Sequence, residues 1–143
     1  MKGSELSNLL KKHDLGDDLF DRENMIFDPH KAAVKRKDIN AARQYAMDTF
    51  GKRYIDNVGT LYPKGDCNLF HFIFMGRMAE YLLFNCDYIS AAVGVAYGDW
   101  EKGGGHMWGY IVEDKDDSPD LVFINWGEEV EDPTFKGDGS IAL

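Results

Sequence analysis

Two residues of the sequence have the types and the setting of a nucleophile and its base. Cys67 follows Gly65 and Asp66 at the predicted start of a long helix. The unpaired N–H groups of a first helical turn and the positive end of the helix dipole favour a thiolate, which is the nucleophilic form of cysteine. His106 follows three glycines at the predicted start of a strand, where an imidazole could serve as the base for that thiolate.

A third polar residue is needed to orient the imidazole, and Asn125 is the candidate. It lies within a predicted apolar strand, Leu121–Trp126, next to the strand of His106. A six-residue loop, Asp114–Pro119, would give the hairpin a register in which His106 is diagonal to Asn125 on the same face, about 7–8 Å away between Cα atoms. A slip of one residue would place the two side chains on opposite faces, so the hypothesis requires this odd register.

The order of these parts resembles the core of transglutaminase-like proteins, which belong to the papain-like cysteine superfamily. The resemblance covers roughly residues 60–126 and rests on Gly-x-Cys at a helix start, on His106-x-Trp108 in a strand and on a following strand with the third residue. It implies acyl transfer through a thioester, on a glutamine-type amide or a peptide bond. Carried over by position, the resemblance makes Cys67 the nucleophile, His106 the proton carrier and Asn125 the orienting group.

Two assignments within this resemblance stay open. The family's third residue is usually Asp, and Asp132, in an Asp-Pro-Thr sequence that resembles the family's ending, competes with Asn125 although papain-like proteases do use Asn. The backbone N–H of Cys67 is the predicted first donor to the oxyanion. The second donor stays open between Tyr62 and Asn57.

Two other functions also fit the sequence. One is a Cys-His peptidoglycan amidopeptidase, since members of that family often carry Asp-Cys at the helix start, as Asp66-Cys67 does. The other is a non-catalytic binding or inhibitory protein that docks on a basic partner through its acidic end. In each enzymatic interpretation the substrate is a protein or peptide, and a basic one is favoured by the charge described next.

The net charge of the chain is confined to its last third. The 143 residues carry 16 Lys and Arg against 25 Asp and Glu, a formal net charge of −9. Residues 1–98 hold 13 basic and 13 acidic side chains, whereas residues 99–143 hold 3 basic and 12 acidic ones. This balance argues against nucleic-acid binding and against docking on an anionic membrane. It favours a cationic partner, with activity or binding that weakens as salt is added.

The remaining composition predicts a soluble cytoplasmic protein without metal or cofactor. The N-terminus has no apolar signal core, although export without such a signal stays open, and the longest apolar run, Leu69–Met75, is far short of the about 20 residues of a membrane span. The acidic stretch Asp114–Asp120 lacks the Gly and Glu that a calcium loop requires. The four histidines have no zinc-ligand spacing with one another or with the two cysteines.

The elements that must position these residues form one α+β domain, with helices first and an antiparallel meander after them. We expect a helical part over 1–58, a Cys-His core over 60–126 and an acidic tail over 127–143. The first helix is capped by Ser4 and ends near His13, and the second is capped by Asp38 and ended or interrupted by Gly51. The other predicted elements are a loop at Asn57–Gly65, a central helix buried on nearly all sides from Cys67 to about Asn85, and strands at Tyr88–Tyr97, Met107–Glu113 and Leu121–Trp126.

Overall fold

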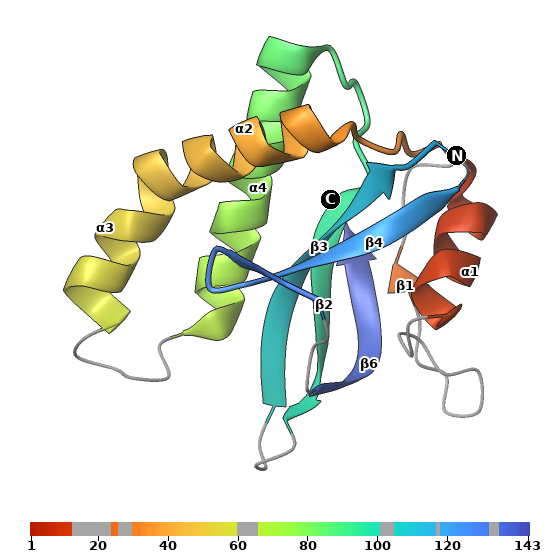
Figure 1. Cartoon of the computed structure of the whole chain (residues 1–143). Coiled ribbons are helices and arrows are strands. Elements are labelled where there is room, and N and C mark those ends of the chain that lie inside the picture. The colour runs from red at the N-terminus through yellow and green to blue at the C-terminus, as the bar shows by residue number, and fades with distance from the viewer. Residues whose placement is uncertain (13–23, 26–29, 60–65, 101–104, 117, 132–134) are drawn as a thin grey trace.

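A computed structural model describes the chain except residues 13–23, 26–29, 60–65, 101–104, 117 and 132–134. Figure 1 shows helices α2 and α4 on one side of a sheet and helix α1 on the other, which confirms the α+β class. The described helical segments are α1 (Gly3–Lys12), α2 (Arg36–Ala46), η2 (Met47–Gly51), α3 (Lys52–Tyr54), η3 (Ile55–Gly59) and α4 (Cys67–Cys86). The described strands are β1 (Asn24–Met25), β2 (Val93–Trp100), β3 (Gly105–Asp114), β4 (Pro119–Asn125), β5 (Glu128–Val130) and β6 (Phe135–Ala142).

The sheet has the strand order β1-β6-β2-β3-β4-β5. Strands β2 to β4 form the predicted antiparallel meander, β5 adds a strand that pairs antiparallel with β4, and β6 returns to pair antiparallel with β2. The predicted acidic tail over 127–143 is therefore wrong, because this segment supplies β5 at one edge and β6 inside the sheet. Strand β6 was not predicted because it contains residues of low strand propensity, namely Gly137, Asp138 and Gly139. Its pairing with β2 stabilises it instead.

The β3–β4 hairpin has the odd register that the sequence hypothesis requires. Gly109 pairs with Ile124 and Val112 pairs with Leu121. Strand β4 ends at Asn125 rather than at Trp126, because Trp126 adopts a left-handed conformation with φ 54° in the turn to β5.

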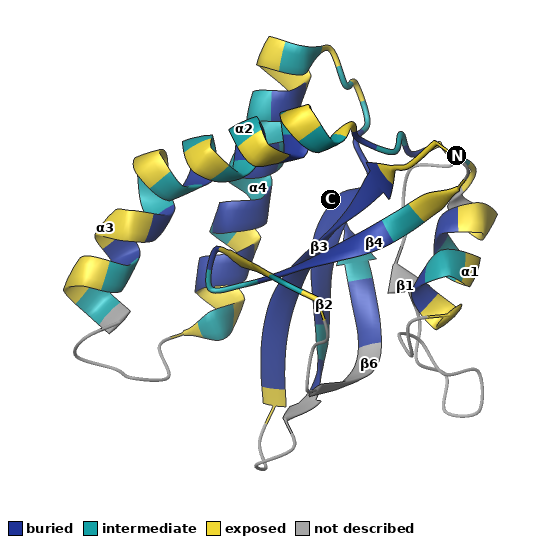
Figure 2. Ribbon diagram, viewed as in Figure 1, coloured by how far each residue is buried: buried dark blue, intermediate teal, exposed yellow. Residues whose placement is uncertain are grey.

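Helix α4 begins and ends close to its predicted bounds. The Asp66 side chain caps it by accepting a hydrogen bond of 3.0 Å from the Leu69 N–H. The expectation that the helix is buried on nearly all sides is wrong, since only one face packs on α2 and the sheet (Figure 2). The buried side chains are those of Phe70, His71, Phe74, Met75, Met78 and Leu82, and the exposed large apolar ones are those of Leu69, Phe72, Leu83 and Phe84.

The N-terminal helices differ from their predictions in three details. Ser4 lies inside α1, and α2 begins after Lys35 without a side-chain cap, while Asp38 instead accepts a hydrogen bond of 2.9 Å from the Tyr88 hydroxyl. The helical segment that begins with α2 continues past Gly51 through η2, α3 and η3, so Asn57 belongs to a helix rather than to a loop. None of the described helices combines the length and the apolar character needed to cross a membrane.

Candidate functional site

His106 and Asn125 are joined by a hydrogen bond beyond the last residue pair of the β3–β4 ladder. The Nε2–H of His106 donates to Oδ1 of Asn125 over 2.8 Å. In a neutral imidazole this leaves Nδ1 as the nitrogen that accepts a proton. The His106 residue is only 5% exposed, and this burial lowers the pKa of its ring, while the bond to Asn125 partly opposes that shift. The imidazole is therefore mostly neutral near pH 7.

Cys67 occupies the first turn of α4, which two contacts hold in place. Asp66 caps the turn, and its backbone N–H donates a hydrogen bond of 2.9 Å to the Tyr54 hydroxyl. The Cys67 side chain is partly buried and packs against the core between the helices and the sheet. Its thiol contacts Oδ1 of Asn68 at 3.6 Å, and within the described residues no hydrogen bond joins Cys67 to His106.

His71 is a residue of the site that the sequence analysis did not assign. Its Nδ1–H donates to the carbonyl oxygen of Cys67 over 2.8 Å, and its Nε2 accepts a hydrogen bond of 2.9 Å from the backbone N–H of Trp126. The ring centroid of His71 lies 6.1 Å from that of His106, edge to face. The sequence does place this histidine on the same helix face as Cys67, four residues later, but that spacing alone assigns it no role.

Burial sets the charge state of His71. The residue has no exposed surface, and burial lowers the pKa of its imidazole to about 4, with a smaller contribution in the same direction from His106. The bond to the Cys67 carbonyl opposes this shift. At neutral pH the ring is therefore neutral, with its proton on Nδ1 because Nε2 faces the N–H of Trp126.

A two-residue turn positions Asn125 at the end of β4. Trp126 and Gly127 join β4 to β5, and both have positive φ, 54° and 85° respectively. This is the pattern of a type I′ hairpin, in which a bulky residue at the first central position is unusual. Glycine is favoured at the second, because φ 85° is strained for residues with a side chain and a Cβ there would also lie 2.5 Å from the Met47 Cε. Arg43 also holds the turn, by donating to the Gly127 carbonyl oxygen over 3.2 Å.

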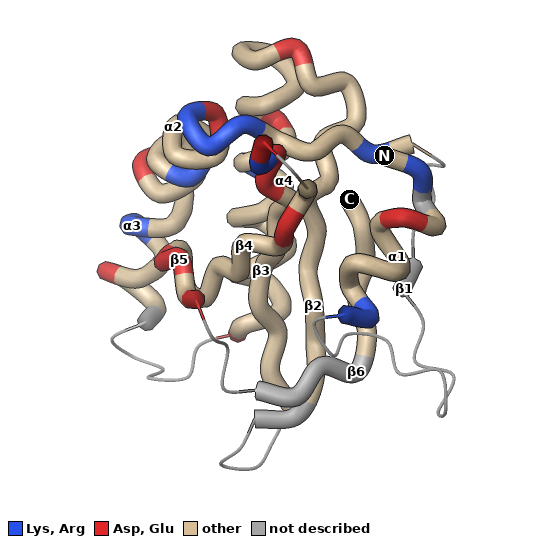
Figure 3. The backbone as a smooth tube through the Cα atoms, turned by 45° about the vertical axis from the view of Figure 1, so that its right-hand side comes forward, with Lys and Arg blue, Asp and Glu red and all other residues tan. Residues whose placement is uncertain are grey.

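Acidic side chains near the β3–β5 end of the sheet are paired with cations of α2. Arg36 donates to both carboxylate oxygens of Glu113, over 2.8 and 2.9 Å, and to those of Glu129, over 2.8 and 3.1 Å. Arg43 lies 3.7 Å from Glu128. Figure 3 shows the basic residues of α2 and the acidic residues of β5 in this part of the molecule. The acidic excess is therefore locally offset, and burial rather than a carboxylate is the main influence on the His106 pKa.

The other sequence candidates stay untested or lie elsewhere. Asp132 and Tyr62 fall outside the described residues. Asn57 is exposed in η3, and its side-chain amide donates to the Arg53 carbonyl oxygen over 2.7 Å within its own helix. Among the described residues, no three His, Cys, Asp or Glu side chains form a group that could hold a metal ion.

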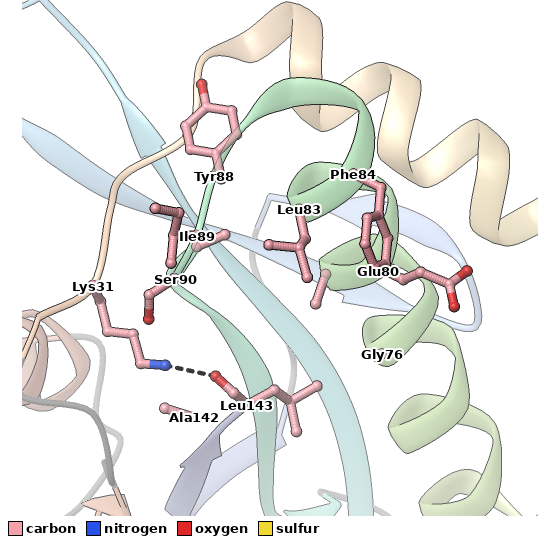
Figure 4. Close-up of a pocket in the computed structure, with 12 residues that line it drawn as sticks. Lys31, Gly76, Glu80, Leu83, Phe84, Tyr88, Ile89, Ser90, Ala142 and Leu143 are labelled. Atoms are coloured by element: carbon pink, nitrogen blue, oxygen red, sulfur yellow. Dashed lines mark hydrogen bonds between the residues drawn. The ribbon is translucent and has the colours of Figure 1, made fainter.

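A pocket lies at the other end of α4, away from Cys67. Leu83, Phe84, Ile89 and Leu143 contribute exposed apolar surface around it, and Lys31 donates to the Leu143 carbonyl oxygen over 2.6 Å (Figure 4). At 1.5 Å per residue, Leu83 lies about 24 Å along the helix from Cys67. This pocket is therefore separate from the part of the molecule that holds Cys67, His71 and His106.

The sequence matches no protein-family model and no curated protein. Any assignment of function therefore depends on the side chains described above.

Proposed function

We propose that the chain is a cysteine-dependent acyl-transfer enzyme that acts on an amide of a protein or peptide, with a transglutaminase-like or papain-like core. One observation carries the proposal, the partly buried hydrogen bond between Nε2–H of His106 and Oδ1 of Asn125. It orients the imidazole and fixes the tautomer that a base for a thiol requires. Cys67 supports the proposal because it lies at a helix N-terminus, four residues before His71, whose ring packs on that of His106.

In the proposed reaction, Nδ1 of His106 takes the thiol proton of Cys67. The thiolate attacks the amide carbonyl carbon and forms a C–S bond, while the carbonyl oxygen becomes an oxyanion near the Cys67 N–H. The C–N bond then breaks as His106 returns the proton to the leaving nitrogen, which leaves a thioester on Cys67. Attack by water gives hydrolysis or deamidation, and attack by an amine gives crosslinking.

This reaction requires the Cys67 side chain to turn from Asn68 toward His106. A single rotation about χ1 changes the direction of the thiol, and catalytic hydrogen bonds are often long or misaligned before substrate binds. The contact with Asn68 at 3.6 Å is a weak one for the rotation to break.

The same contact with Asn68 favours a second candidate, a non-catalytic protein that binds a basic partner. In that case the thiol would have no chemical role, and the acidic excess of residues 99–143 would attract the basic partner. The two candidates differ in whether Cys67 can form a thioester.

Trapping of the acyl-enzyme with p-nitrophenyl acetate tests the proposal. We expect one acetyl group on Cys67 by mass spectrometry and a burst of p-nitrophenol that Cys67→Ala abolishes. Cys86→Ala is the matched control and should leave the burst intact. His106→Asn should slow the burst by about 10²-fold or more, the usual contribution of a general base. An equal burst in Cys67→Ala would overturn the proposal in favour of the binding protein.

A further inference from the structure

We infer that His71 is a positioning residue, which holds the Cys67 turn of α4 and the Asn125 end of β4 in the relative placement that the reaction needs. This inference rests on the proposed function. The carrying observation is that one buried ring bonds to both segments, through Nδ1 to the Cys67 carbonyl and through Nε2 to the Trp126 N–H. The ring also packs edge to face on His106.

The bond to Trp126 acts on a strained residue. Tryptophan with φ 54° lies in the left-handed region, which costs a non-glycine residue of order 1 kcal/mol or more. The first central N–H of such a turn does not pair across the hairpin, so it requires another acceptor when it is buried. Nε2 of His71 is that acceptor, and the Trp126 ring packs 5.2 Å from the His71 ring and 5.0 Å from that of Phe70.

The consequence reaches His106 through Asn125. Asn125 is the last residue of β4 and directly precedes Trp126, so the turn determines where its amide points. Loss of the His71 contact would free residue 126 to leave the left-handed region. Asn125 would then no longer hold the His106 imidazole, and the base would lose its orientation.

Two substitutions separate the two bonds of His71. The side-chain oxygen of His71→Gln reaches the position of Nε2, so this variant keeps an acceptor for Trp126. The side-chain nitrogen of His71→Asn matches Nδ1, so it keeps the donor to the Cys67 carbonyl and loses the acceptor. Met78→Ala is the control for stability alone, because Met78 is fully buried on the same face of α4 and belongs to the apolar core.

Two readouts are measured in a Cys86→Ala background, namely hydrogen exchange of the Trp126 amide and alkylation of Cys67 by iodoacetamide at pH 6. We expect His71→Asn to speed the exchange and to slow the alkylation, each about tenfold, the upper range for one hydrogen bond. His71→Gln should stay within about threefold of the starting protein in both. Met78→Ala should leave the alkylation rate unchanged.

A rescue variant keeps the test decisive if His71→Asn folds poorly. Asparagine tolerates the left-handed region, and Asn-Gly is the preferred type I′ pair. Adding Trp126→Asn to His71→Asn should therefore recover most of the alkylation rate. The inference is overturned if His71→Gln and His71→Asn give the same exchange rate, or if the double variant shows no recovery. A slow Cys67 in the starting protein, together with the expected fast Trp126 exchange in His71→Asn and near-normal exchange in His71→Gln, would instead count against the proposed function.

Discussion

At the scale of single residues, the site contains two neutral imidazoles that differ in role. His106 donates to the Asn125 side chain and is the proposed base, whereas His71 bonds to two backbone groups. Protonation of His71 would place a donor against the Trp126 N–H inside the core. Burial is the main cause of the lowered pKa of each ring.

The first prediction concerns stability in acid. The pKa of His71 is about 4 in the folded protein, against 6.5 as its ordinary value, so the unfolded chain binds the proton more readily between these pH values. The free energy of unfolding should therefore fall as the pH drops from 6.5 to about 4, by about 3 kcal/mol in all from this group. Urea unfolding at pH 7, 5.5 and 4.5 measures the slope, which His71→Gln should reduce. An unchanged slope in His71→Gln would refute the assignment.

Residue types and hairpin register were enough to propose Cys67, His106 and Asn125 from the sequence. They were not enough to propose His71, whose role depends on a contact between distant segments. Cys67 lies at a helix start, and the hairpin register that brings Asn125 to His106 follows from the length of one loop. His71 was not assigned because its role depends on the Trp126 turn, which joins α4 through a backbone N–H. No short sequence pattern predicts the contact between His71 and the Trp126 N–H.

At the scale of elements, a glycine of α4 and a glycine of β3 should respond in opposite ways to replacement by alanine. A Cβ on Gly76 would meet no atom within 4 Å, whereas a Cβ on Gly109 would lie 2.3 Å from the sulfur of Met75. We predict that Gly76→Ala raises the free energy of unfolding by about 0.5–1 kcal/mol, since alanine is the better helix residue. Gly109→Ala should lower it by about 1–3 kcal/mol through overpacking. Chemical denaturation checks both, and a shared sign would contradict the packing described here.

A second element-scale prediction concerns the ion pairs that attach α2 to the sheet. Arg36 bonds to Glu113, whose side chain is 10% exposed, so Arg36→Met would leave a mostly buried carboxylate without its partner. We expect a loss of about 1–2 kcal/mol in unfolding free energy. Arg77→Met is the matched control, because the Arg77–Glu80 pair is open to solvent and should change stability by less than about 0.5 kcal/mol. Equal losses of unfolding free energy in the two variants would show that the Arg36–Glu113 pair contributes no more to stability than an exposed pair.

The predicted elements were most accurate where one element carries its own signals. Helix α4 has an Asp66 cap and a continuous apolar run, and its observed bounds differ from the prediction by one residue. Strand β6 was missed because its glycine-containing sequence depends on pairing with β2 rather than on propensity. The exposed apolar face of α4 could not be predicted either, since burial depends on how much of the helix its neighbours cover.

At the scale of the whole molecule, the net charge of −9 should still influence which reagents approach Cys67. Pairing with Arg36 and Arg43 reduces the field near the site without cancelling the excess. We predict that a cationic methanethiosulfonate reagent modifies Cys67 faster than an anionic one, after correction for their rates with free cysteine. The preference should shrink between 0.02 and about 0.5 M salt, because the Debye length falls well below 10 Å. A preference for the anionic reagent would contradict the charge argument.

The central claim is that His106 activates Cys67, and the rate of Cys67 alkylation at pH 6 tests it most directly. Cys86 supplies an internal reference, because burial raises the pKa of its thiol and should keep it slow. We predict that Cys67 reacts at least about tenfold faster than Cys86, and that His106→Asn removes most of this difference. Equal rates for the two thiols, or a fast Cys67 that His106→Asn leaves unchanged, would contradict the account.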